Sequence, residues 1–123
     1  MTAAFVYDDD CGFCTWWAEL FAARTDLRIV GFAELDPELE GRLPDDYEAC
    51  SHLVTDETVY SCGAAIEEAL LRTDPGSLVR PAVEALRQFE DYRQLRERAY
   101  RWGADNRALL GKLVSSPPPA RRG

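Results

Sequence analysis

The spacing of apolar residues divides the first third of the chain into a strand, a helix and a second strand. Residues 3–7 and residues 27–32 are both short runs of β-prone apolar residues. Strand, helix and strand in this order form a βαβ unit, in which the two strands run parallel with a right-handed crossover. Between the runs, residues 12–24 carry apolar side chains three and four positions apart, which predicts one apolar helical face made of Phe13, Trp16, Trp17, Leu20 and Phe21.

The middle of the chain alternates between turn residues and short apolar runs. An acidic stretch interrupted by two prolines predicts a short helix around residues 36–41, followed by a loop. Residues 53–55 and 58–60 flank an Asp-Glu pair and predict a hairpin of two short strands. Residues 64–72 have helical spacing, and a Pro-Gly pair follows them.

The C-terminal third predicts only helices. Two apolar patterns with helical spacing cover residues 77–89 and 92–113. We therefore expect a single domain over residues 1–114, with a helical extension at about 77–113. Residues 115–123 are rich in proline and arginine and predict a disordered tail.

Length, composition and charge narrow the class of protein. The chain has 123 residues and a formal net charge of −8. Most acidic residues lie before residue 76 and most basic residues after it, so we expect the two parts to attract each other, and we expect no nucleic acid at the acidic part. No run approaches the roughly 20 apolar residues of a membrane span, and no secretory signal is visible. These features predict a cytoplasmic protein.

The motif Cys11-Gly12-Phe13-Cys14 lies where the first strand meets the first helix. Unpaired backbone N–H groups and the dipole at a helix N-terminus favour negative charge, so they lower the pKa of a thiol placed there. Cys14 follows one helical turn later, close enough to form a disulfide with Cys11. The motif predicts a redox pair, with Cys11 as the nucleophile and Cys14 as the resolving thiol. A metal site and inert packing are the alternatives.

Three consecutive acidic residues, Asp8, Asp9 and Asp10, precede this motif. Like-charge repulsion disfavours a nearby thiolate and so opposes the helix N-terminus. Asp10 is also a candidate helix cap, and one of the carboxylates is a candidate proton acceptor for Cys14. Arg107 is a candidate ion-pair partner for one of these acids, which would relieve the repulsion.

The predicted topology brings further residues toward the motif. The element order β-α-β-α-β-β-α matches a thioredoxin-like α/β layout, here with additional C-terminal helices. In that layout the third strand is antiparallel to the first, and the fourth returns beside the third. Cys50 and His52, at the start of the third strand, and Cys62, at the end of the fourth, would then approach Cys11.

Several interpretations of these residues remain open. Cys50 and Cys62 are buried small apolar residues, a second thiol pair that relays a disulfide, or the remaining half of a four-cysteine metal site with Cys11 and Cys14. A structural disulfide is not expected in a reducing compartment. His52 is either a hydrogen-bonded strand residue or a proton shuttle near the thiols.

Residues 7–14, Tyr-Asp-Asp-Asp-Cys-Gly-Phe-Cys, resemble the signature of the DCC family of thiol-disulfide oxidoreductases, which carries Asp-Gly-x-Cys-x-x-Cys directly after its first strand. Residues 51–65 resemble the middle region of that family, and residues 99–107 resemble its C-terminal segment. Together these segments extend over most of residues 4–112. The resemblance implies a thioredoxin-like fold and a redox activity.

The chain departs from these patterns at two places. Asp9 stands where the DCC family usually has glycine. Thioredoxins place a cis-proline before the third strand and use its neighbouring backbone to hold a substrate peptide, whereas Cys50 and Ser51 occupy these positions here. The missing proline argues against a general protein disulfide reductase.

The function that we predict from the sequence is thiol-disulfide exchange by Cys11 and Cys14 without a cofactor. The substrate is a disulfide-containing protein or a small thiol. The alternative is a binding module without catalysis, which uses a four-cysteine metal site or the basic C-terminal helices to hold a partner.

Overall fold

Four strands form one mixed sheet in the order β2-β1-β3-β4 in the computed structural model, which describes residues 2–117. β1 pairs in parallel with β2 and antiparallel with β3, and β3 pairs antiparallel with β4. The strands are β1 (Ala4–Tyr7), β2 (Arg28–Gly31), β3 (His52–Val54) and β4 (Val59–Ser61). This sheet confirms the predicted βαβ unit and hairpin, and with them the thioredoxin-like α/β class.

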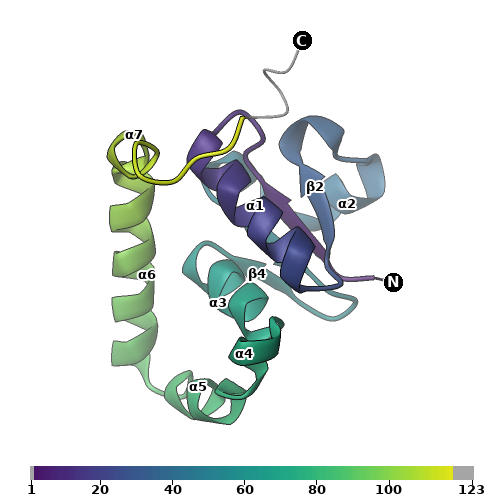
Figure 1. Ribbon diagram of the computed structural model, residues 1–123. Coiled ribbons are helices and arrows are strands. Elements are labelled where there is room, and N and C mark those ends of the chain that lie inside the picture. Colours follow the sequence, from purple (N-terminus) through teal and green to yellow (C-terminus); the bar gives the residue numbers. More distant parts are fainter. Residues whose placement is uncertain (1, 118–123) are drawn as a thin grey trace.

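Helices cover both faces of the sheet and extend beyond it (Figure 1). Single 3-10 turns, η1 (Phe32–Glu34) and η2 (Tyr47–Ala49), lie in the acidic middle stretch. The helices are α1 (Gly12–Arg24), α2 (Pro37–Arg42), α3 (Gly63–Leu71), α4 (Asp74–Ser77), α5 (Arg80–Leu86), α6 (Glu90–Asp105) and α7 (Arg107–Leu110). Among the described residues, none of these helices has both the length and the apolar character that crossing a membrane requires.

The two faces of the sheet bury two separate apolar clusters. Phe5 and Leu53 point toward α1 and α3, where they contact buried residues of both helices. Val6 and Val54 point to the other face, toward α2. Successive strand residues alternate between faces, so this assignment fixes which side chains can reach the α1 side.

The buried face of α1 differs from the predicted one. Its buried residues are Thr15, Ala18 and Phe21, and only Phe21 belongs to the expected apolar stripe. Trp17 is partly buried and packs against the core, and its ring meets that of Trp16 edge to face. The small side chains of Thr15 and Ala18 allow α1 to lie close to the sheet. The other large apolar side chains of the helix are only partly buried.

The C-terminal helices are more broken than predicted. The helix expected over residues 77–89 is the shorter α5, which begins only at Arg80 and is separate from α4, because Pro81 lies in the first turn of α5 and its missing N–H cannot continue a helix from α4. The helix expected over residues 92–113 begins earlier, at Glu90, and is interrupted at Asn106. The side chain of Asn106 donates a hydrogen bond to the Trp102 carbonyl, which ends α6.

The predicted tail begins with an ordered contact. Ser116 donates its backbone N–H to the Gly12 carbonyl (3.1 Å) and its hydroxyl to Glu19 Oε2 (2.6 Å). These two hydrogen bonds join Ser116, the second residue of the predicted tail, to α1. Residues 118–123 of the predicted tail lie outside the described part of the chain.

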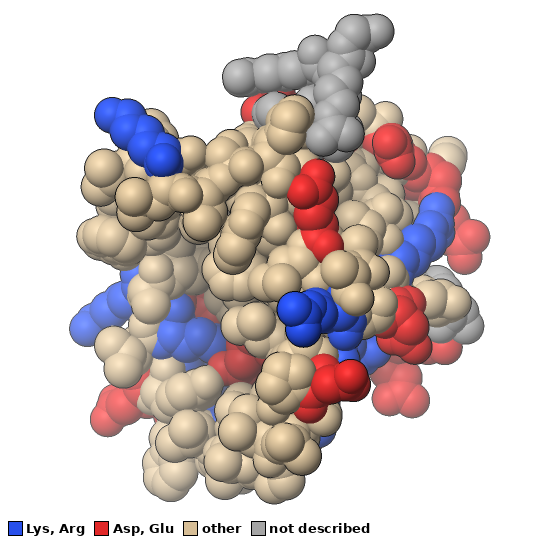
Figure 2. Space-filling view, in the orientation of Figure 1, with Lys and Arg blue, Asp and Glu red and all other residues tan. Residues whose placement is uncertain are grey.

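Ion pairs join the acidic and basic parts of the chain, as the charge distribution predicted. Glu68 on α3 is only 2% exposed, and its carboxylate accepts hydrogen bonds from Arg72, Arg80 and Arg87. Glu67, beside it, pairs with Arg96 of α6 at 3.2 Å. On the face drawn in Figure 2, uncharged residues cover much of the centre, and acidic side chains are frequent at the right-hand edge.

Candidate active site at the start of helix α1

The cysteine motif lies where the sequence predicts it, at the first turn of α1. Cys11 is itself the N-cap, in an extended backbone conformation, and its Sγ accepts the backbone N–H of Cys14 at 3.2 Å. Both thiols are free and half-buried. The prediction that Asp10 caps this helix is therefore wrong, because the cysteine sulfur takes the place of a capping oxygen.

The environment shifts the pKa values of the two thiols in opposite directions. The Cys14 thiol donates to the Cys11 sulfur, and this hydrogen bond is the main reason that the pKa of Cys11 falls to about 6. Burial opposes the fall, whereas the Cys14 N–H and the charge of Arg107 favour it. The same hydrogen bond, together with burial, raises the pKa of Cys14 well above its ordinary value. Cys11 is therefore the thiolate of the pair near neutral pH.

The acidic triplet has three different local roles. Asp8 Oδ2 accepts from Arg107 Nη1 at 3.3 Å, and Asp8 Oδ1 accepts the Asp10 backbone N–H at 3.0 Å. Asp8 raises the pKa of both thiols, but it is the smallest of the causes that act on Cys11. Asp10 is exposed at the turn. Like-charge repulsion is thus present at the site, and the hydrogen bonds from Cys14 and the charge of Arg107 outweigh it at Cys11.

Asp9 is a buried structural residue rather than a solvated one. It is 5% exposed, and its Oδ2 accepts the backbone N–H of Ala33 at 3.1 Å. It also lies against Gly31, where a Cβ atom would overlap the Asp9 side chain. Asp9 therefore ties the loop before α1 to the end of β2, and a glycine at this position could not make that bond.

The other two cysteines form a disulfide with each other. Cys50 precedes β3 and Cys62 follows β4, so the bond closes the open end of the hairpin, with Cα atoms 5.1 Å apart. The prediction of two buried free thiols is wrong, as is the expectation of no disulfide, because antiparallel pairing brings the ends of the two strands together. With this bond formed, the four-thiolate metal site considered for Cys11, Cys14, Cys50 and Cys62 cannot assemble.

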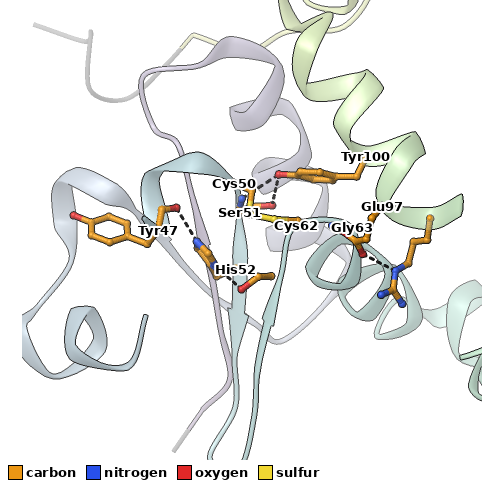
Figure 3. The surroundings of a disulfide bond; sticks show 10 residues. Tyr47, Cys50, Ser51, His52, Cys62, Gly63, Glu97 and Tyr100 are labelled. Carbon is orange, nitrogen blue, oxygen red and sulfur yellow. Dashed lines mark hydrogen bonds and ion pairs between the residues drawn. A yellow bond between two sulfur atoms is a disulfide. The ribbon is translucent and has the colours of Figure 1, made fainter. Parts of the chain in front are cut away.

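His52 does not reach the thiols. It shares the sheet face of Val54, opposite α1, because strand side chains alternate. Its Nε2 donates to the Tyr47 carbonyl at 2.7 Å, and its Nδ1 pairs with the Ser61 hydroxyl at 2.8 Å (Figure 3). Burial lowers the pKa of His52. It is a neutral strand residue with both ring nitrogens engaged, so the proton-shuttle interpretation is wrong.

A cavity of about 190 Å³ adjoins the thiol pair. Cys14 lines it from α1, Cys50 lines it from the start of the hairpin, and Arg107 lines it from α7. Most of the remaining wall is apolar, with Asp8, Glu48, Ser51 and the Tyr100 hydroxyl as polar exceptions. The fold therefore places one cysteine of each pair, Cys14 and Cys50, together with Arg107 around one small, mainly apolar space.

Two contacts from α6 hold the hairpin end, and the sequence did not indicate either. The Tyr100 hydroxyl accepts the Ser51 N–H at 3.1 Å, and Glu97 Oε1 accepts the Gly63 N–H at 2.9 Å. The sequence separations are 49 and 34 residues. No local pattern encodes such pairings, because they depend on where the broken C-terminal helices turn back.

A family model agrees with this site. It describes the DCC1-like thiol-disulfide oxidoreductases and matches residues 5–113. The chain therefore belongs to the DCC1-like thiol-disulfide oxidoreductase family. No curated protein and no solved structure matches the chain at a significant level.

Proposed function

We propose that this chain is a thiol-disulfide oxidoreductase in which Cys11 is the nucleophile and Cys14 the resolving thiol. The observation that carries the proposal is the hydrogen bonding at the start of α1. Cys11 Sγ accepts the thiol and the backbone N–H of Cys14, and these two hydrogen bonds help lower the pKa of Cys11 to about 6, so the thiolate predominates at neutral pH.

The reaction has two balanced exchange steps. The Cys11 thiolate attacks one sulfur of a substrate disulfide, forms a mixed disulfide and releases the other sulfur as a thiolate. Cys14 then attacks Cys11 Sγ, which forms the Cys11–Cys14 disulfide and releases the second substrate sulfur. Two electrons pass to the substrate, and a dithiol or two molecules of a monothiol must later return two electrons to the pair, ending as a disulfide. We assign the reaction to the cytoplasm, whose thiol pool supplies such a reductant.

The resolving step requires Cys14 to lose its proton. The hydrogen bond to the Cys11 thiolate is the main cause that raises the pKa of Cys14, and it vanishes once Cys11 is in a mixed disulfide. Asp8 lines the same cavity as Cys14 and is the carboxylate that we assign as proton acceptor. Asp8→Asn should then slow resolution and lengthen the life of the mixed disulfide.

Trapping the mixed disulfide tests the mechanism. Cys14→Ser, incubated with glutathione disulfide, should accumulate a stable glutathione adduct at Cys11, identified by peptide mass mapping. Cys11→Ser is the matched control and should carry no adduct at Cys14. If the wild-type Cys11–Cys14 pair stays reduced throughout a series of glutathione redox buffers, the proposed function is wrong.

A further inference from the structure

The Cys50–Cys62 disulfide lies between the hairpin and α6. Cys50 directly precedes Ser51, and Cys62 directly precedes Gly63. Together with the hydrogen bond from the Cys62 N–H to the Ser51 carbonyl (2.9 Å), the disulfide fixes the spacing between two backbone N–H groups, one beside each cysteine.

Both of these N–H groups donate to side chains of α6. The Ser51 N–H donates to the Tyr100 hydroxyl, and the Gly63 N–H donates to Glu97 Oε1. Figure 3 draws these residues where the hairpin end meets α6. Glu97 and Tyr100 are three residues apart, so they lie on one face of α6. If the spacing between Ser51 and Gly63 changed, their two N–H groups could no longer both bond to Tyr100 and Glu97 on that face of α6.

The same helix covers the cavity beside the thiol pair. Tyr100 and Gly103 of α6 line it, together with Cys14 and Cys50. Arg107, two residues beyond the end of α6, reaches Asp8 at the start of the site. The position of α6 therefore determines how closed the cavity is and where the arginine lies.

Backbone strain marks the second cysteine of the disulfide. Cys62 is the only described non-glycine residue with a positive φ, at 59°. This conformation is costly for a residue with a side chain, and it persists only where the surroundings enforce it. Opening the disulfide removes one of these constraints. Cys62 is half-buried, whereas Cys50 is 7% exposed, so Cys62 is the more exposed residue of the pair.

We propose that Cys50–Cys62 is a second redox site, cleaved by a dithiol, whose opening releases α6 from the hairpin and uncovers the cavity beside Cys14. A thiolate of the dithiol attacks Cys62 Sγ, and Cys50 leaves as a thiolate and takes up a proton. The second thiol of the reductant then displaces Cys62, so the reductant ends as a disulfide and the hairpin carries two thiols. The inference rests on the proposed function only in treating the covered cavity as part of a catalytic site.

Hydrogen exchange of the full-length protein before and after dithiothreitol treatment tests the inference. Thiol titration should rise from two to four free thiols per chain under native conditions. The amides of α6 should then exchange roughly tenfold faster, as expected when two anchoring hydrogen bonds are lost, while those of α1 stay unchanged. Two results would overturn the inference: exchange in α6 that is equal at two and four thiols, or a disulfide that resists the dithiol until the protein unfolds.

Variants separate the disulfide from the contacts it supports. Cys50→Ala with Cys62→Ala should reproduce the fast exchange of α6 without any reductant. Tyr100→Phe keeps the disulfide but removes the hydroxyl that accepts from Ser51, and it should accelerate exchange in α6 by a few-fold. Tyr47→Phe, on the other side of the hairpin, is the control and should leave α6 unchanged. Equal exchange in Tyr100→Phe and the wild type would overturn the role of the Ser51 contact.

These readouts are independent of turnover. The exchange of α6 depends on Cys50 and Cys62, whereas trapping of a mixed disulfide depends on Cys11. A protein that never forms the trapped adduct but still loosens α6 on reduction would refute the proposed function and retain the second redox site. A protein that forms the adduct, but whose α6 exchanges equally fast before and after reduction, would refute the second redox site and retain the proposed function.

Discussion

The two cysteine pairs of this chain are built in opposite ways. Cys11 and Cys14 begin a helix one turn apart, both thiols are free, and the thiol and backbone N–H of Cys14 stabilise a thiolate at Cys11. Cys50 and Cys62 end two paired strands, so the sheet register brings them together as a disulfide. The helix start therefore holds a free dithiol, whereas the hairpin end holds a cross-link.

The largest expected effect separates the two pairs by activity. Cys11→Ser should reduce disulfide reduction by more than about 1000-fold, the scale seen when a catalytic nucleophile is removed. The double variant Cys50→Ala with Cys62→Ala should keep most of the turnover, because it leaves the nucleophile in place. Steady-state reduction of glutathione disulfide measures both. A double variant as inactive as Cys11→Ser would erase the distinction between the pairs.

The next effect concerns how firmly the C-terminal helices are held beside the second pair. Glu68→Gln should lower the free energy of unfolding by about 2–3 kcal/mol, because it removes a buried charge that accepts from three arginines. Glu84→Gln is the control, since Glu84 is exposed and pairs with Arg80 at 3.6 Å, and it should cost at most about 0.5 kcal/mol. Urea denaturation measures both values, and equal midpoints would contradict the prediction.

The pH dependence of that stability has a definite sign. Burial works to raise the pKa of Glu68, but hydrogen bonds from Arg80 and Arg87 lower it overall. A carboxyl group with a lowered pKa stabilises the fold above its unfolded value of about 4.5, and this contribution disappears as pH falls through the lowered value. The difference between wild type and Glu68→Gln should therefore shrink in acid.

The pH dependence of alkylation tests whether Cys11 is the thiolate of the Cys11–Cys14 pair. The rate of Cys11 alkylation by iodoacetamide should rise about tenfold between pH 5 and pH 8 and level off above a midpoint near 6. Cys14 should remain unmodified over this range, because its pKa is raised. Peptide mapping assigns the alkylated residue. A midpoint near the ordinary thiol value of 9.0 would show that the hydrogen bonds from Cys14 do not stabilise the Cys11 thiolate.

The smallest expected effect tests the link between the C-terminal helices and the reactive pair. Arg107→Gln should slow Cys11 alkylation at pH 6 by about threefold, because the variant loses a nearby positive charge and leaves the Asp8 carboxylate uncompensated. Arg101→Gln, on the exposed side of α6, is the matched control and should have no effect. Equal rates in the two variants would show that Arg107 does not reach the thiolate electrostatically.

The parts of this molecule that could be predicted from the sequence are those with local or periodic signals. The bounds of α1 and the strand pairing follow from apolar spacing and turn residues, and the cysteine motif follows from its position at a helix start. The direction of the Cys11 pKa shift could not be predicted, because it depends on a balance of Cys14, Arg107, Asp8 and burial.

The errors have physical reasons. The topology did bring His52 to the correct end of the sheet, but strand alternation turns its ring to the opposite face. The disulfide was missed because its bond depends on the register of two short strands rather than on cysteine spacing. The roles of Asp9 and Glu97 could not be predicted from single acidic residues in the sequence. Each accepts a hydrogen bond from a backbone N–H that only the fold brings near, that of Ala33 for Asp9 and that of Gly63 for Glu97.

The contact between Ser116 and α1 has a consequence for how the cysteine motif can vary. Gly12 lies between the two reactive cysteines, and a Cβ atom there would overlap the Ser115 side chain. The Gly12 carbonyl also holds the chain by accepting the Ser116 N–H. In this protein, a larger residue at position 12 would therefore require the Ser115 side chain to move, so the residues allowed at position 12 depend on a segment more than 100 residues away in the sequence.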